Sequence, residues 1–222
     1  MLCAGARREW ITLVVTTALL AAGAAVLGWW WASLMIVVLG GVVLLTFRDP
    51  NRNPPSQRGV VVSAADGRVS SIHVLEDCAP LGGRTLCVRV FLSLLNVHVV
   101  RIPCYGRIAS IEHRPGRYVS ALNPASVEEN ESVTLVIEHP TSQASVAVVR
   151  LIAGQFARTV RLFVQEGQTL QRGQRLGIIL LGSTAEVYLP DAAVADCVVS
   201  EQDRVRAGES VIVGVRGEGS AS

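Results

Sequence analysis

The sequence predicts a mainly β domain that is preceded by a pair of apolar helices. Residues 10 to 47 contain no charged side chain, whereas the rest of the chain has ordinary polar spacing. From residue 59 onward, short runs rich in valine and isoleucine alternate with glycine or proline, which is typical of strands and turns. No later stretch keeps an apolar period of 3.6 residues for three turns, so its helices should be short and peripheral. A chain of 222 residues has room for one such domain besides the apolar segment.

The apolar segment is too long for one helix that crosses a membrane. As a continuous helix, residues 10 to 47 would extend about 57 Å, against roughly 30 Å of bilayer hydrocarbon. Two helices of about 17 residues fit that thickness. The break should lie near Gly28 and the cluster Trp29 to Trp31, because glycine loosens a helix and tryptophan prefers the membrane interface. We therefore expect a membrane-embedded helical hairpin over residues 10–47.

Arginines on both sides of this segment predict its orientation. Arg7 and Arg8 precede it, and Arg48 and Arg52 follow it. The positive-inside rule therefore places both ends on the cytoplasmic side of the cell membrane, the inner or plasma membrane. Residues 1–9 would then be a cytoplasmic N-terminus, and residues 48–222 a cytoplasmic domain. A cleaved signal peptide is the alternative, but it leaves the second apolar stretch unexplained.

The strands of the domain are predicted from apolar runs of strand length. They are Gly59–Val62, Thr85–Leu92, Arg107–Glu112, Ser132–Glu138, Ala144–Ile152, Arg161–Val164 and Gly177–Leu181.

Two segments near the C-terminus repeat one pattern. In residues 164–174 and 199–209, a turn precedes an apolar residue, polar residues and a glycine that closes a second turn. This arrangement resembles the hammerhead of lipoyl-like, barrel-sandwich folds. Because such folds host carriers, zinc peptidases and other enzymes, the fold alone does not decide the function.

Composition excludes several classes of function. A net charge of +2 without a basic run that alternates with aromatics argues against nucleic-acid binding. All twenty basic residues are arginine, so chemistry that needs lysine is excluded. Five cysteines without C-x-x-C spacing indicate neither a disulfide framework nor a zinc site, and we expect reduced thiols and no metal.

Three short blocks place reactive side chains among strand and turn signals. They are residues 63–69, 91–103 and 181–184, and they supply Asp66, His98 and Ser183. These residue types can form an orienting acid, a base and a nucleophile, since such triads are defined by geometry and not by position in the sequence. Singly, each has an ordinary interpretation as a turn residue, a core histidine or a strand end.

Together, the blocks resemble those of the phosphatidylserine decarboxylase family, short form. The family patterns S-P-A-D-G-R-V, F-L-S-x-x-N-V-H-V-x-R-x-P and L-G-S-T have counterparts in the same order, with Ala64 in place of the proline. Residues 47–52 with Pro54 match a further family pattern, as do residues 152–158, although Thr159 stands where the family often has arginine. The likeness runs from about residue 47 to residue 214.

The resemblance implies a proenzyme that cleaves itself between Gly182 and Ser183. Glycine leaves its carbonyl open to attack, and the Ser183 hydroxyl can reach that carbonyl from the next residue. His98, oriented by Asp66, would take the hydroxyl proton. Elimination and hydrolysis would then give a β chain of residues 1–182 and an α chain of residues 183–222 that begins with a pyruvoyl group derived from Ser183.

The implied activity is decarboxylation of a membrane phospholipid. The pyruvoyl group would form a Schiff base with phosphatidylserine, and loss of CO2 would give phosphatidylethanolamine. Pyridoxal phosphate is excluded, because it needs a lysine. His98 would also return a proton to the substrate, and Arg101 and Arg158 would bind its phosphate. The partners implied are the phospholipid, the membrane and the two chains of the cleaved protein as a heterodimer, while higher oligomers are left open.

Other functions fit parts of the sequence. A serine hydrolase would use the same Ser183, His98 and Asp66, although the serine lacks a G-x-S-x-G context. A non-catalytic, lipoyl-like membrane adaptor would fit the two repeats, but a carrier of this type needs a lysine. A zinc peptidase would need an H-x-H pair, and His98 has Asn96 and Val100 at those spacings.

Overall fold

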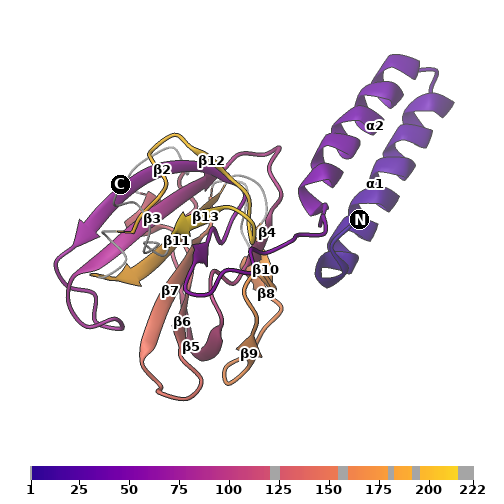
Figure 1. Ribbon diagram of the computed structural model, residues 1–222. Coiled ribbons are helices and arrows are strands. Elements are labelled where there is room, and N and C mark those ends of the chain that lie inside the picture. The colour runs from indigo at the N-terminus through magenta and orange to yellow at the C-terminus, as the bar shows by residue number, and fades with distance from the viewer. Residues whose placement is uncertain (1, 121–125, 155–159, 180–182, 192–195, 215–222) are drawn as a thin grey trace, which may run out of the picture.

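A computed structural model describes residues 2–120, 126–154, 160–179, 183–191 and 196–214. The two apolar helices lie side by side as a hairpin beside the β domain, and the turn between them points away from that domain (Figure 1). They are α1 (Arg7–Val26) and α2 (Trp30–Leu44). Between them Gly28 has a φ of 77°, a conformation that favours glycine and lets the chain reverse. The predicted break near Gly28 is confirmed.

Both helices are long and apolar enough to cross a membrane. The two candidate spans are Ala4–Val26 and Trp30–Phe47, and in each only 11% of the apolar window is buried. Two short 3-10 turns, Ala4–Ala6 and Leu45–Phe47, extend the helices at the end next to the β domain. The buried residues Cys3, Ala6 and Phe47 pack there against strands of the domain.

An eight-stranded antiparallel sheet forms the body of the domain. Its strand order is β12-β2-β3-β11-β7-β6-β5-β9. The bounds are β2 (Gly67–Leu75), β3 (Thr85–Leu92), β5 (Gly106–Arg114), β6 (Ser132–Glu138), β7 (Ser145–Ile152), β9 (Thr169–Leu170), β11 (Ser183–Pro190) and β12 (Arg204–Val205). β11 is an interior strand, because β3 and β7 pair with its two edges.

Two smaller sheets complete the domain. One has the order β4-β10-β8, with bounds Val99–Arg101, Arg175–Ile179 and Val160–Leu162, and the other pairs β1 (Val61–Val62) with β13 (Val211–Val213). A single helical turn, α3 (Ser126–Glu129), precedes β6. Every predicted strand has a counterpart, and the domain is mainly β as expected.

Among the strands outside the predicted runs, β4, β9, β12 and β13 have only two or three residues each, while the two long ones, β2 and β11, were missed for local reasons. β2 carries Ser70 and Ser71 on a half-exposed strand, so its apolar run is interrupted. β11 contains Glu186, whose charge is compensated by arginines on the neighbouring strands. A charge that is neutralised across strands cannot be recognised from the strand's own sequence.

The two repeated segments fold alike. Residues 164–174 contain β9 and residues 199–209 contain β12, and these strands form the two edges of the large sheet. A glycine with positive φ follows each strand, Gly173 at 80° and Gly208 at 77°. β9 pairs with the beginning of β5, and β12 pairs with the beginning of β2. The sequence repeat therefore corresponds to a structural one.

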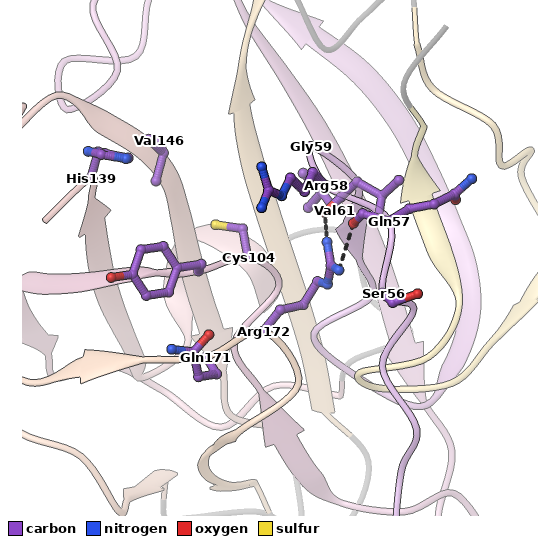
Figure 2. Close-up of a pocket in the computed structure, with 12 residues that line it drawn as sticks. Ser56, Gln57, Arg58, Gly59, Val61, Cys104, His139, Val146, Gln171 and Arg172 are labelled. Carbon is purple, nitrogen blue, oxygen red and sulfur yellow. Dashed lines mark hydrogen bonds between the residues drawn. The ribbon is translucent and has the colours of Figure 1, made fainter. Parts of the chain in front are cut away.

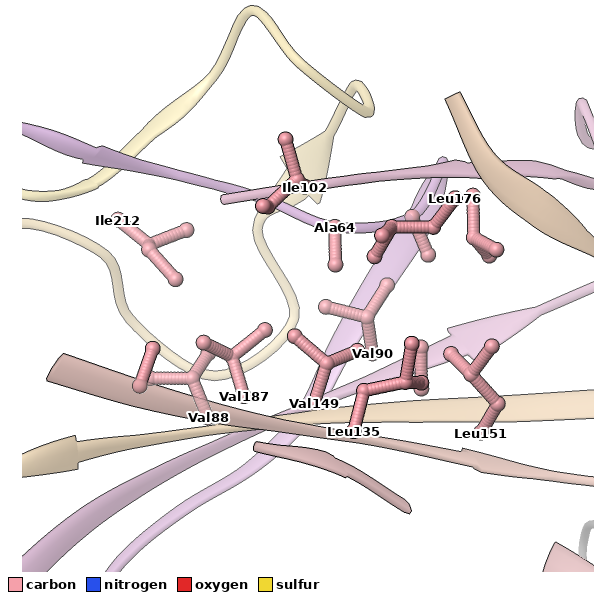
Figure 3. Close-up of a cluster of buried hydrophobic side chains, with 14 of the residues drawn as sticks. Ala64, Val88, Val90, Ile102, Leu135, Val149, Leu151, Leu176, Val187 and Ile212 are labelled. Atoms are coloured by element: carbon pink, nitrogen blue, oxygen red, sulfur yellow. The ribbon is translucent and has the colours of Figure 1, made fainter. Parts of the chain in front are cut away.

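The core lies between the large sheet and the strands that cover it. Figure 3 shows Val88, Val90, Leu135 and Val149 from the large sheet facing Ala64, Ile102 and Leu176 on the other side. Nearly all of these side chains are fully buried. Burying them removes apolar surface from water, which stabilises the fold by roughly 25 cal/mol per Å2.

Candidate active site

Ser183 lies at the first position of the interior strand β11. Its backbone pairs with Leu92 of β3, so the two side chains share the core-facing side of the sheet. The side chain of Ser183 is fully buried, and its Oγ has no hydrogen-bond partner among the described residues. A buried hydroxyl without a partner is uncommon and calls for an explanation such as a catalytic role. The predicted cleavage partner, Gly182, lies outside the described residues.

His98 immediately precedes β4 and is also fully buried. Its Nδ1 lies 2.8 Å from the carbonyl oxygen of Asn96. A carbonyl only accepts hydrogen bonds, so Nδ1 carries the proton and Nε2 has a free lone pair. Within the described part of the chain, Nε2 has no hydrogen-bond partner.

The surroundings of His98 keep its imidazole neutral. Burial lowers the pKa of His98 to about 4, and the nearby positive charge of Arg48 acts in the same direction, against the hydrogen bond to Asn96. At neutral pH the ring therefore offers an unprotonated Nε2, which is the form that a general base requires.

The fold brings His98 and Ser183 into the same region. The carbonyl of His98 accepts a hydrogen bond of 3.0 Å from the backbone N–H of Ile179, at the end of β10. Ser183 follows Ile179 by four residues, which span at most about 14 Å. On the other side, the Ser93–Asn96 turn connects His98 to the end of β3, which pairs with Ser183. The hydroxyl of Ser183, a buried donor, and Nε2 of His98, a buried acceptor, thus lie on adjoining segments, and neither has a partner among the described residues.

Asp66 makes different contacts from those predicted. Its carboxylate accepts hydrogen bonds of 2.9 and 2.7 Å from Nη2 of Arg52 and one of 2.8 Å from the backbone N–H of Ala207. Burial raises the pKa of Asp66, while Ala207 and Arg52 act in the opposite direction. The prediction that Asp66 orients His98 is therefore corrected for this structure, since the Nδ1 proton goes to Asn96. The catalytic role predicted for Asp66 remains a prediction.

The segment that follows the helical hairpin is tied to the domain by ion pairs. Asp49 is buried and pairs with Arg101 and Arg175, and Arg52 pairs with Asp66 and with Glu209. The guanidinium of Arg101 also donates to the carbonyl oxygen of Gly173. Arg101 is thus a buried structural partner of Asp49, and its predicted contact with substrate phosphate remains a prediction. Arg158 lies outside the described residues.

A pocket of about 590 Å3 adjoins these residues. It is lined by Asp66, Gly67, Arg68, Phe91, Ser93, Leu95, Asn96, Arg204, Val205 and Arg206. Asp66 and Asn96 belong to its wall, and Phe91 precedes the residue that pairs with Ser183. Of the three candidate residues, Asp66 lines this space, which can admit a ligand, whereas His98 and Ser183 are not part of its lining.

A second pocket lies in another part of the domain and contains none of the three candidate residues. Figure 2 shows it lined by Cys104, His139, Val146 and Gln171, with Arg172 directed toward the segment of Gln57. Its volume is about 490 Å3. Arg172 donates to the backbone carbonyls of Val60 and Gln57, at 2.8 and 2.7 Å, so it holds that segment in place.

The five cysteines are unpaired residues, and all are free thiols. Burial raises the pKa of Cys87 and of Cys104 to about 12, which keeps both thiols protonated and unreactive. Within the described ranges, no group of three histidine, cysteine or acidic residues is placed to hold a metal ion.

Sequence reasoning missed two contributors to the site. Arg52 was assigned to a family pattern and to the basic residues that flank the apolar segment, yet it is the buried partner of Asp66. Its position in a charged cluster directly after the apolar segment was a usable signal. Asn96 lies within the family pattern of residues 91–103, and its side chain holds the turn through hydrogen bonds with Ser93. Its contact with His98 uses the backbone carbonyl, a group that every residue type has, so this contact could not be predicted from the sequence.

Comparisons with known proteins agree with the motif analysis. A family model described as phosphatidylserine decarboxylase matches residues 39–213. A phosphatidylserine decarboxylase proenzyme of Rhodopirellula baltica is 37% identical over 165 residues, which is 74% of this chain and 68% of the relative. Proteins of the same description are 39% identical in Symbiobacterium thermophilum, over 77% of each chain, and 41% identical in Nitrobacter winogradskyi, over 76% of this chain and 68% of the relative.

Proposed function

Because the chain belongs to the phosphatidylserine decarboxylase family, we propose that it is a self-cleaving precursor that converts phosphatidylserine into phosphatidylethanolamine and CO2. The enzyme class is that of a carboxy-lyase. One observation carries the site assignment: Ser183 and His98 are both fully buried, with a free hydroxyl on one and a free Nε2 lone pair on the other. These are the groups that self-cleavage at Ser183 requires.

Maturation begins with proton transfer from Ser183 to His98. Nε2 of His98 takes the hydroxyl proton, and Oγ attacks the carbonyl carbon of Gly182. The C–N bond breaks, nitrogen regains a proton, and an ester joins the two parts of the chain. Loss of the α-proton of Ser183 then expels the carboxylate of Gly182 and leaves dehydroalanine, which water converts to a pyruvoyl group and ammonia.

The surroundings of position 183 fit such a group. The position is buried at the beginning of an interior strand, so it is shielded from bulk water, and the neutral imidazole of His98 lies on an adjoining segment. A pyruvoyl group there supplies an electron sink for the electrons released when CO2 leaves. We assign to His98 the return of a proton to the substrate, because its Nε2 is the free basic atom of the described site.

Finer assignments belong to the same proposal. We place the enzyme at the cell membrane, anchored by the hairpin and with its domain on the cytoplasmic side, which the flanking arginines support. We also assign the domain to the barrel-sandwich, lipoyl-like type, which the two equivalent edge segments support. After cleavage, the α and β chains form a heterodimer. A serine hydrolase is not favoured, because the family membership indicates a lyase.

Denaturing mass spectrometry of the expressed protein tests the proposal. The wild-type chain should give two fragments, the smaller covering residues 183–222 and carrying a carbonyl that borohydride reduces. Ser183→Ala and His98→Gln should each leave one uncut chain, because the nucleophile or the base is missing. Ser200→Ala, which changes an exposed serine, should be cleaved like the wild type. An active wild-type enzyme that remains a single uncut chain would refute the proposal.

A further inference from the structure

The pocket beside Asp66 carries a concentration of positive charge. Arg68, Arg204 and Arg206 all line it, and all three are exposed. Asp66 is the one acidic residue in the lining, and its charge is balanced by Arg52 behind it. The pocket is therefore net positive, and an anion is the ligand that its charge favours.

These arginines differ from most of the other arginines around the site. Arg52, Arg101 and Arg175 are all engaged by buried or half-buried carboxylates. Among the described residues, the guanidinium of Arg68 donates to the neutral amide oxygen of Gln202, at 3.1 Å, and not to a carboxylate. Within the described part of the chain, Arg204 and Arg206 form no salt bridge within 4 Å, although the charge of Arg206 helps to lower the pKa of Glu209, so both guanidinium groups can accept an anionic ligand. Guanidinium matches the geometry of phosphate oxygens and binds them through two parallel hydrogen bonds.

The backbone fixes the arginines at one end of the large sheet. Arg68 and Arg204 are directly paired across β2 and β12, so their side chains emerge on the same face. Arg68 also pairs with Phe91 of β3. A direct neighbour of Phe91 on the next strand is Thr184, the residue after the predicted pyruvoyl position. The charged pocket thus lies at the same end of the sheet as the reacting residue. Arg68, Phe91 and Thr184 share the outer face there, whereas the side chains of Leu92 and Ser183 face the core.

The opposite wall of the pocket adjoins the helical hairpin. Arg48, the first residue after the second apolar span, donates a hydrogen bond of 2.7 Å to the carbonyl oxygen of Leu95. Leu95 lines the pocket, and its side chain and that of Leu94 are 59% and 48% exposed. In a membrane crossed by the hairpin, the end of that span lies at the level of the lipid headgroups. The pocket therefore opens where lipid phosphates are found.

We propose that this pocket binds the phosphodiester group of an anionic phospholipid, with Arg68, Arg204 and Arg206 as its contacts. Leu94 and Leu95 lie at the membrane surface beside the pocket. The identity of the lipid in this inference rests on the proposed function. The roles proposed for Ser183 and His98 in the chemistry are unchanged. It assigns headgroup recognition to arginines that are separate from Arg101, whose guanidinium is occupied by Asp49.

Ligand binding to an uncut variant tests the proposal apart from catalysis. The full chain with Ser183→Ala, held in phosphatidylcholine nanodiscs, is titrated with soluble dihexanoylphosphatidylserine in a calorimeter. Adding Arg204→Gln and Arg206→Gln should weaken binding at least tenfold, because two charged donors to the phosphate are lost. Arg68→Gln, on β2, should also weaken binding. Arg117→Gln changes a highly exposed arginine outside the pocket and should leave affinity within twofold.

Two further measurements identify the ligand and exclude misfolding. Inorganic phosphate should compete with the short-chain lipid in the parent chain but bind more weakly than the lipid. Phosphate that binds as tightly as the lipid would indicate a free-phosphate site and overturn the lipid assignment. Affinity that is unchanged by the arginine substitutions, in variants that melt at the parent temperature, would overturn the proposal. Failure of the proposed function would appear separately, as an uncut wild-type chain.

Discussion

At His98, burial away from water and a hydrogen bond to the backbone together determine the protonation state of the imidazole ring. Burial disfavours the charged form, and the carbonyl oxygen of Asn96 holds the proton on Nδ1. Together they present a neutral Nε2, with a backbone carbonyl and not a carboxylate as the partner of Nδ1. A base of this kind depends on the backbone conformation of the Ser93–Asn96 turn, which is itself fixed by the side chain of Asn96 through hydrogen bonds to Ser93.

The low pKa of His98 predicts an unusual pH dependence of self-cleavage. The pKa is about 4 in the folded chain, so Nε2 stays unprotonated down to that pH. A histidine with an ordinary pKa near 6.5 would be about ten times less available as a base at pH 5.5 than at high pH. We expect the cleavage rate of freshly translated chains to change little between pH 7.5 and 5.5 and to fall toward pH 4. A tenfold loss by pH 5.5, measured on denaturing gels, would contradict this assignment.

The pair of Asp66 and Arg52 predicts coupled effects on stability. Both side chains are largely buried, so removing one leaves the other charge with fewer partners. In the uncut Ser183→Ala chain, Asp66→Ala and Arg52→Ala should each lower the free energy of unfolding by roughly 2 to 4 kcal/mol. The double variant should cost little more than the worse single one, because the two share one interaction. Unfolding measured by denaturant titration checks this, and strictly additive losses would show that the pair is not coupled.

At the scale of single elements, β11 combines the reacting residue with a buried charge network. Glu186 is fully buried in the middle of the strand, between Arg89 of β3 and Arg150 of β7, and accepts a hydrogen bond from Tyr188. The network joins the three central strands through side chains as well as through their backbone hydrogen bonds. It therefore helps to hold the strand that begins with Ser183.

Breaking this network should destabilise the domain strongly. Glu186→Ala leaves two arginines without their carboxylate, and we expect a loss of roughly 3 to 5 kcal/mol in the uncut Ser183→Ala chain. Asp191→Ala, just beyond the end of β11, removes an exposed partner of Arg84 and should change stability by less than about 0.5 kcal/mol. Denaturant titration of both variants measures the difference. Equal effects of the two substitutions would mean that the buried carboxylate does not hold the sheet together.

At the scale of the whole molecule, the predicted cleavage lies between two sheets. Ile179 ends a strand of the three-stranded sheet, and Ser183 begins a strand of the eight-stranded one. The part of the chain after the cut includes β11, β12 and β13. These strands pair with β3, β7, β2 and β1 of the part before it.

This interleaving predicts that cleavage does not release the α chain. Since β11 keeps its backbone hydrogen bonds to strands on both sides, the two chains should stay together at close to the 23.7 kDa of the uncut protein, plus bound detergent. Native mass spectrometry should give this 1:1 complex. Denaturant without reductant should separate the chains, because none of the cysteines forms a disulfide. Loss of the α chain under native conditions would contradict the expectation, and the uncut Ser183→Ala chain is the control.

The sequence by itself determined the features that depend on local pattern and composition. The uncharged stretch with Gly28 in its middle predicted two helices, valine-rich runs predicted most strands, and three motifs predicted Ser183, His98 and Asp66. Only the tertiary structure decided which groups meet. Arg52 and Glu209 are 157 residues apart, and Nδ1 of His98 bonds to a backbone carbonyl and not to Asp66. Such partners depend on how the chain packs, because packing brings distant segments together and burial makes an unpaired charge unfavourable. A local sequence pattern therefore cannot predict them.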